Sequence, residues 1–207
     1  MGRAICIENT SRHKSTIQLL TVIVALSVIL VLNVSKAFAH CDTMGGPVIT
    51  AAQRALATKN VNLILIWVQQ KDETEVRQRF QETLGVRGLN NDARVVADNY
   101  FFETVVRLHR LGEGEPYTGI KPAGTDLGPV IPIADKALDS GSIEPLLRLF
   151  APTLKLDIET LFKDVRAKKS FAEDDVAAGR VYVKAYVNFL HHLEHVYSTS
   201  KKGNHSH

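Results

Sequence analysis

The stretch N-D-A-R-V-V-A-D-N-Y-F-F-E-T-V-V-R-L-H-R-L, residues 91–111, decides the fold class. Its apolar residues recur at intervals of three and four, which predicts an amphipathic helix that buries one face. The residues on that face are Val95, Phe102, Val105 and Val106. Asn91-Asp92 supplies side-chain oxygens that can cap the start of this helix.

Helical spacing continues on both sides of this stretch. Before it, we expect a helix from Pro47 with Ile49, Ala52 and Leu56 inward, and a polar helix over 72–84 with Val76, Phe80 and Leu84 inward. The apolar run 61–68, which includes Trp67, fits a buried helix or a strand by periodicity alone. After it, we expect shorter helices near 133–138, 143–150 and 156–168, and a long helix over 173–197.

One irregular segment interrupts the helices. Residues 112–129 hold five of the 13 glycines and three of the seven prolines, so we expect a long loop there. The sequence shows no internal repeat and no convincing set of alternating strands. We therefore predict an all-α, single-domain helical bundle over residues 40–200, followed by a flexible polar tail at 201–207.

Composition excludes several classes of function. The chain has 207 residues, 45% hydrophobic and 23% charged, which is typical of a globular protein. Four of the 25 Lys and Arg residues and one of the 22 Asp and Glu residues lie in 1–39, which leaves 21 of each sign in the remainder. Such a balanced surface argues against a nucleic-acid partner. The absence of a G-x-x-x-x-G-K-[ST] motif argues against a bound nucleotide.

The N-terminal segment has the three parts of a secretory signal. Basic residues precede an uncharged apolar stretch over 15–35, and Ala37-Phe38-Ala39 follows it. We predict cleavage after Ala39 and a periplasmic or secreted domain. The alternative is an uncleaved membrane anchor, because the apolar stretch reaches the lower length for a transmembrane helix. Protein partners cannot be named from the sequence.

Several polar side chains fall on apolar helix faces. His109 and Asp98 lie on the apolar side of 91–111, and Glu194 lies in the middle of the apolar stripe of the last helix, with His191 at its edge. The residues that form this second stripe are Val176, Val183, Val187, Leu190 and Tyr197. Burying a polar group is costly unless it is paired or coordinated, and facing helices commonly build metal sites in bundle cores. These side chains are therefore either hydrogen-bonded core residues or parts of a site.

The histidines of the last helix form a short motif. His191-His192-Leu193-Glu194-His195 matches H-x-x-E-H, in which His191 and His195 would bind zinc and Glu194 would activate water. No acidic residue follows His195 that could serve as a further ligand. We therefore favour a simple cation site here over a peptidase.

Cleavage after Ala39 would place His40 and Cys41 at a free N-terminus. The terminal amine, the imidazole and the adjacent thiolate could then reach one metal ion. Thiolate and imidazole donors select copper, nickel or zinc over magnesium or calcium. We expect copper or nickel, with His109 or Glu194 completing the shell.

This start resembles that of nickel superoxide dismutase, whose mature chain begins H-C-D-x-x-C-G and binds nickel through its first histidine and cysteine. His40, Cys41, Asp42 and Gly46 match that motif, whereas Gly45 stands where the family has its second cysteine. The resemblance implies a nickel hook with a redox role at His40 and Cys41. The missing thiolate weakens that implication.

The rest of the chain resembles an uncharacterised family of exported bacterial proteins. The matching motifs are H-C-D-T-M-x-G-P-V from residue 40, N-V-N-L-x-L-x-W-V at 60–68, and Y-F-F-E-T-x-V-R-x-H-R-x-G-E-G-x-P-Y-T-G at 100–119. That family implies a domain but no activity. Two hypotheses follow from the sequence. The first is an exported metal-binding protein with a redox role. The second is a non-catalytic helical module for interactions at the cell envelope, in which Cys41 has no function.

Overall fold

The computed structural model describes residues 40–203, with side chains up to Ser200. The predicted signal or anchor at 1–39 and the end of the polar tail at 204–207 lie outside this range. All the elements described are helical, apart from one isolated bridge between Thr43 and Lys121, which confirms the all-α prediction. The α-helices are α2 (Pro47–Thr58), α3 (Asn62–Leu65), α4 (Glu73–Val86), α5 (Asn91–Glu113), α6 (Val130–Ser140), α7 (Glu144–Leu147), α8 (Lys155–Lys168) and α9 (Val176–Gly203). Two short 3₁₀ helices, η2 (Gln70–Asp72) and η3 (Pro152–Leu154), precede α4 and α8.

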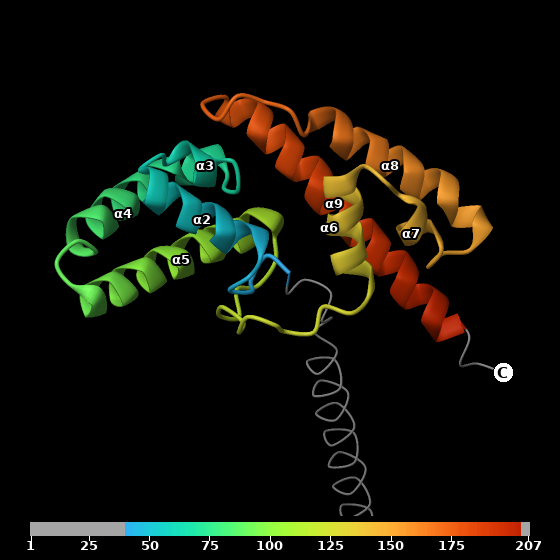
Figure 1. Ribbon diagram of the computed structural model, residues 1–207, viewed down its shortest axis with the longest axis horizontal. Coiled ribbons are helices and arrows are strands. Elements are labelled where there is room, and N and C mark those ends of the chain that lie inside the picture. The colour runs from blue at the N-terminus through green and yellow to red at the C-terminus, as the bar shows by residue number, and fades with distance from the viewer. Residues whose placement is uncertain (1–39, 204–207) are drawn as a thin grey trace, which may run out of the picture. The chain divides into compact units, whose positions relative to one another are not determined.

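The N-terminal helices form one packed group. Helices α4 and α5 pack against each other as a hairpin, and α2 lies against both α3 and α5 (Figure 1). The inward positions expected on α2 and α4 are buried, apart from the partly buried Leu84. Ile49 and Val76 are fully inaccessible, and Phe80 is only 1% exposed. The apolar run 61–68 becomes α3 and the turns after it, so the strand alternative is excluded.

The C-terminal helices form the second group. The long helix α9 packs along α8 and against α6, and it also reaches α3 of the first group (Figure 1). Val183, Phe189, Leu190 and Leu193 of α9 are buried in one core that both groups share. The loop between α5 and α6 runs from Gly114 to Pro129, as the density of glycine and proline predicted.

The central helix α5 begins one residue earlier than expected. Asn90 is the capping residue, and its side-chain oxygen accepts a hydrogen bond of 2.8 Å from the backbone N–H of Ala93. The helix ends at Glu113, and the next residue, Gly114, caps it with a positive φ of 78° that suits glycine. The helix therefore extends past Leu111 and carries Glu113 on its last turn.

One inward residue predicted on α5 was wrong. Val95 is 60% exposed, and its neighbour Val96 is 69% exposed. Both lie in the first turns of α5, next to the loop that joins it to α4. Helical periodicity gives the direction of a side chain but not the point at which the neighbouring helices end. The apolar stripe of α5 is buried only from Phe101 onward, apart from Ala97.

The residues predicted to form the apolar stripe of α9 do face the core. Val183 and Leu190 are buried, and the other three residues of the stripe are partly buried against the core. The helix runs on to Gly203, so the start of the predicted tail is helical. Within residues 40–203, no helix is both long enough and apolar enough to cross a membrane.

Candidate functional site

The segment that begins at His40 forms a tight turn beside the core. Thr43 donates two hydrogen bonds to the His40 carbonyl oxygen, from its hydroxyl at 3.0 Å and from its backbone N–H at 3.4 Å. The N–H of Gly46 then donates to the Thr43 carbonyl at 2.8 Å. A Cβ on Gly46 would lie 2.1 Å from the His40 carbonyl oxygen, so only glycine allows the chain to return this closely.

The long loop between α5 and α6 holds this turn in place. The N–H of Lys121 donates to the Asp42 carbonyl at 2.8 Å, and the N–H of Met44 donates to the Lys121 carbonyl at 3.0 Å. These two bonds make the isolated parallel bridge of the fold. The glycine-rich loop therefore fixes residues 42–44 through backbone hydrogen bonds.

Cys41 lies inside this turn, next to two imidazoles. It is 8% exposed, and it is the one cysteine among residues 40–203. Burial alone would raise the pKa of the thiol, but its interactions with His109 and His40 outweigh burial and lower the pKa. The site therefore favours a thiolate.

His109 reaches Cys41 from the last third of α5. Its Nδ1 donates a hydrogen bond of 2.8 Å to the backbone carbonyl of Trp67, which directs Nε2 to the other side of the ring. This Nε2 lies 3.2 Å from Oε1 of Glu113, although neither atom has a hydrogen-bond partner with good geometry. Burial would lower the pKa of His109, but Cys41 and Glu113 outweigh it and raise the pKa to about 10. His109 is 3% exposed, as its place on an apolar face predicted.

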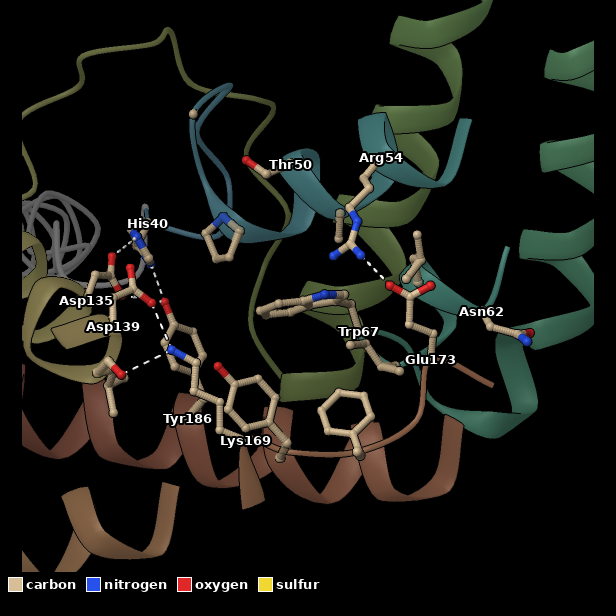
Figure 2. A pocket seen from close by; sticks show the side chains of 18 residues that line it. His40, Thr50, Arg54, Asn62, Trp67, Asp135, Asp139, Lys169, Glu173 and Tyr186 are labelled. Carbon is tan, nitrogen blue, oxygen red and sulfur yellow. Dashed lines mark hydrogen bonds and ion pairs between the residues drawn. The ribbon is translucent and has the colours of Figure 1, made fainter. Parts of the chain in front are cut away.

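His40 is held from the opposite side by α6 and α9. Its Nε2 lies 2.9 Å from Oδ2 of Asp135, and the Tyr186 hydroxyl donates to the other carboxylate oxygen at 2.8 Å (Figure 2). The same hydroxyl lies 3.5 Å from Nδ1 of His40. Burial would lower the pKa of His40, but Asp135 and Cys41 outweigh it and raise the pKa to about 9.

A buried arginine completes the charge balance. Arg110 of α5 is 4% exposed and lies near three carboxylates, at 3.0 Å from Glu113, 3.6 Å from Asp42 and 3.8 Å from Glu115. Burial would raise the pKa of Glu113, but His109 and Arg110 outweigh it and lower the pKa. For Asp42, burial outweighs the cations and raises the pKa. A charge this deeply buried needs such partners.

Two of the polar residues predicted on α9 join the site and one does not. His191 and Glu194 line a small cavity together with His40 and Cys41. Burial raises the pKa of Glu194 to about 7 and lowers the pKa of His191. His195, one helical turn after His191, is exposed and does not line this cavity.

Asp98 is a structural residue. Its carboxylate accepts two hydrogen bonds from Arg87, at 2.7 and 3.0 Å, across the α4–α5 hairpin. The sequence left open whether Asp98 is a hydrogen-bonded core residue or part of a site. Its pairing with Arg87 supports the first alternative.

Sequence reasoning missed several residues of this cluster. Glu113 could have been found, because it follows His109 by four residues and so shares its helix face. Asp135 and Tyr186 gave no signal, because they come from distant helices and meet His40 only in the folded chain. The Trp67 carbonyl is a backbone group, which no side-chain motif reveals.

The side chains of this cluster exchange hydrogen bonds and charge with one another. In residues 40–203, no three His, Cys, Asp or Glu side chains are arranged as a group that could hold a metal ion. The arrangement can do two things chemically as it stands. It can share protons between the thiol and two imidazoles, and it can keep a thiolate away from solvent.

A larger cavity of about 650 Å³ opens beside His40 (Figure 2). Its wall includes Trp67, Tyr182 and Tyr186, and two ion pairs lie along it. This volume lies in the range of sites that bind small molecules.

Fold and site define an all-α domain with a buried cluster of one thiol, two imidazoles and their carboxylate partners. The chain belongs to the DUF6448 family of unknown function, whose model matches residues 45–192. No curated protein matches the chain, and no solved structure does.

Proposed function

We propose that this domain binds one transition-metal ion, copper or nickel, through the Cys41 thiolate and the imidazoles of His109 and His40, which do not form a ready-made metal site in residues 40–203 and would have to turn toward the ion. One observation carries the proposal. The cysteine lies between two imidazoles, and each imidazole has its outer nitrogen held by a second group. Trp67 holds His109 through its carbonyl, and Asp135 holds His40 through its carboxylate.

This pattern is typical of metal-binding histidines. A histidine that binds a metal through one nitrogen almost always donates its other N–H to a carbonyl or a carboxylate, which fixes the tautomer and the ring orientation. The buried Nε2 of His109, which has no well-formed hydrogen bond, faces the region of Cys41 and Glu113. A metal ion would take the place of the protons that the thiol and the imidazoles now share.

The orientation of the His40 ring suits a chelate. Asp135 occupies Nε2, so Nδ1 is the nitrogen left for a metal. If the chain is cleaved after Ala39, the new terminal amine and Nδ1 of the same residue can close a six-membered ring with the ion. Glu194 and His191 line the cavity next to these atoms and are candidates for a further ligand.

A one-electron redox role follows from the same donors. Thiolate and imidazole ligands suit copper in two oxidation states, and the burial of Cys41 limits its access to solvent. The partial nickel-hook motif supports the same class of chemistry, with superoxide as one substrate to test. The missing second thiolate at Gly45 favours copper over nickel.

Metal binding can be tested on the exported protein. The protein is purified after export, its N-terminus is identified by intact mass, and it is stripped of metal and titrated anaerobically with Cu⁺ and Ni²⁺. We expect one tightly bound ion per chain. Cys41→Ser and His109→Gln should each weaken binding by at least tenfold, while the exposed His195→Ala should not.

Two outcomes would contradict the metal proposal. One is a protein that binds neither ion, and the other is a Cys41→Ser variant that binds both as tightly as the wild type does. Either outcome would favour the second hypothesis, that of a non-catalytic interaction module.

A further inference from the structure

We infer that the 650 Å³ cavity beside His40 binds a small organic cation, a molecule that carries an alkylated ammonium group. The inference does not depend on a metal, because it rests on the aromatic and acidic wall of the cavity and not on Cys41. It assigns a ligand class to a cavity that the proposed metal site leaves unused.

Aromatic rings form a corner on one side of this cavity. The rings of Trp67 and Tyr186 lie 6.0 Å apart at 89°, so they meet as two adjoining walls (Figure 2). Tyr182 continues the wall, nearly parallel to Tyr186 at 26° with centroids 6.1 Å apart, and Phe171 follows it at 5.7 Å. Aromatic side chains that line a cavity favour alkylated ammonium groups through cation–π interactions.

Carboxylates supply the complementary charge. Asp135, Asp139 and Glu173 line the cavity and pair with three cations, His40, Lys169 and Arg54, so that the charges of the wall balance. Asp139 pairs with Lys169 at 2.9 Å, yet its side chain is 81% exposed, so it can meet a ligand as well. The negative potential also acts on the aromatic wall: burial, Asp139 and Asp135 together raise the pKa of Tyr182.

The two ion pairs stand on opposite sides of the aromatic corner. Glu173 pairs with Arg54 on one side, and Asp139 pairs with Lys169 on the other (Figure 2). A cation between them gains the aromatic side chains and the exposed carboxylate of Asp139. An anion would have to displace a carboxylate from its partner and would meet the negative side of the rings. The aromatic wall therefore favours a cation over a neutral molecule of the same shape.

Trp67 makes the test direct, because it is the single tryptophan of the chain and lines the cavity. Purified, metal-free protein is titrated with choline and, separately, with 3,3-dimethyl-1-butanol, a neutral molecule of the same shape. We expect a saturable change in tryptophan fluorescence with choline, and binding of the neutral molecule weaker by about tenfold. Calorimetry gives the stoichiometry, which should be one.

Variants separate the aromatic wall from the general fold. Tyr182→Leu should weaken choline binding about tenfold, whereas Tyr182→Phe keeps the ring and should retain binding. Lys169→Met removes a competing cation and should strengthen binding. Circular dichroism checks that each variant stays helical. In the Cys41→Ser background choline should bind as it does to the wild type, so the choline experiment is independent of the metal proposal.

Three results would overturn the inference. The first is the absence of saturable choline binding, and the second is equal affinity for choline and the neutral molecule. The third is a folded Tyr182→Leu variant that binds choline as well as Tyr182→Phe does.

Discussion

Gly46 packs directly against the carbonyl oxygen of His40, to which a Cβ at position 46 would approach within 2.1 Å. The preceding residue, Gly45, has open space where its Cβ would lie. We therefore expect Gly46→Ala to displace the turn that carries Cys41 and to destabilise the protein by about 1–3 kcal/mol, the usual cost of overpacking. Gly45→Ala is the matched control. Urea denaturation measures both, and equal stability of the two variants would contradict this role of Gly46.

Asp135 should tune the metal site without being a ligand. Its carboxylate lies 2.9 Å from Nε2 of His40 and also accepts the Tyr186 hydroxyl. Loss of such an outer partner typically costs about 10–100-fold in metal affinity, so Asp135→Asn should weaken copper or nickel binding to that extent. Asp139→Asn, one helical turn further along α6, removes a carboxylate that pairs with Lys169 and should leave metal affinity unchanged. A metal affinity that does not respond to Asp135→Asn would remove His40 from the proposed ligands.

The Arg87–Asp98 pair should contribute to stability alone. The two hydrogen bonds join Arg87, which caps the end of α4, to Asp98 in the first half of α5. Both side chains are partly buried, at 25% and 19% exposure. A double-mutant cycle with Arg87→Ala and Asp98→Ala should give a coupling energy of about 1 kcal/mol, at the upper end for an exposed pair. Metal binding should not change in any of these variants. A loss of metal binding in Asp98→Ala would show that this residue acts on the site.

The helices could be predicted from sequence because each buries a stripe that repeats at helical spacing. The same logic found His109, which lies on the buried face of α5. It failed at Val95, because the extent of the neighbouring helices is a tertiary property. It failed also at Asp135 and Tyr186, which join His40 only after α6 and α9 have packed. The sequence singled out the His-Cys pair as a candidate site, but it did not reveal the carboxylate and carbonyl groups that contact it.

Glu194 should make stability depend on pH. Burial raises its pKa to about 7 in the folded protein, above the value of 4.5 expected for the unfolded chain. The folded state therefore keeps a proton that the unfolded state loses, and stability falls as pH rises from about 4.5 to about 7. Glu194→Gln has no such titration, so its stability relative to the wild type should increase with pH. Between pH 4.5 and pH 8 this difference in the free energy of unfolding should grow by up to about 3 kcal/mol in favour of the variant.

Chemical denaturation at both pH values measures this difference, and Glu144→Gln on the exposed side of α7 is the control. A stability gain in Glu194→Gln that is the same at both pH values would show that burial does not shift this carboxyl group.

The free amine of His40 is the last part of the proposed site to test. Three donor atoms would then come from two residues: the amine and Nδ1 of His40, and the thiolate of Cys41. A variant with one extra residue before His40 keeps every side chain but moves the amine away, so it should bind copper or nickel at least tenfold more weakly. The wild-type affinity should fall as pH drops, because protons compete with the metal for amine, imidazole and thiolate. In the extended variant this decrease should be less steep, since one titrating donor is lost. Competition titrations with a chelator at several pH values measure both effects. Equal affinities and equal pH slopes for the two proteins would show that the amine is not a ligand and would leave His109 and Cys41 as the core of the site.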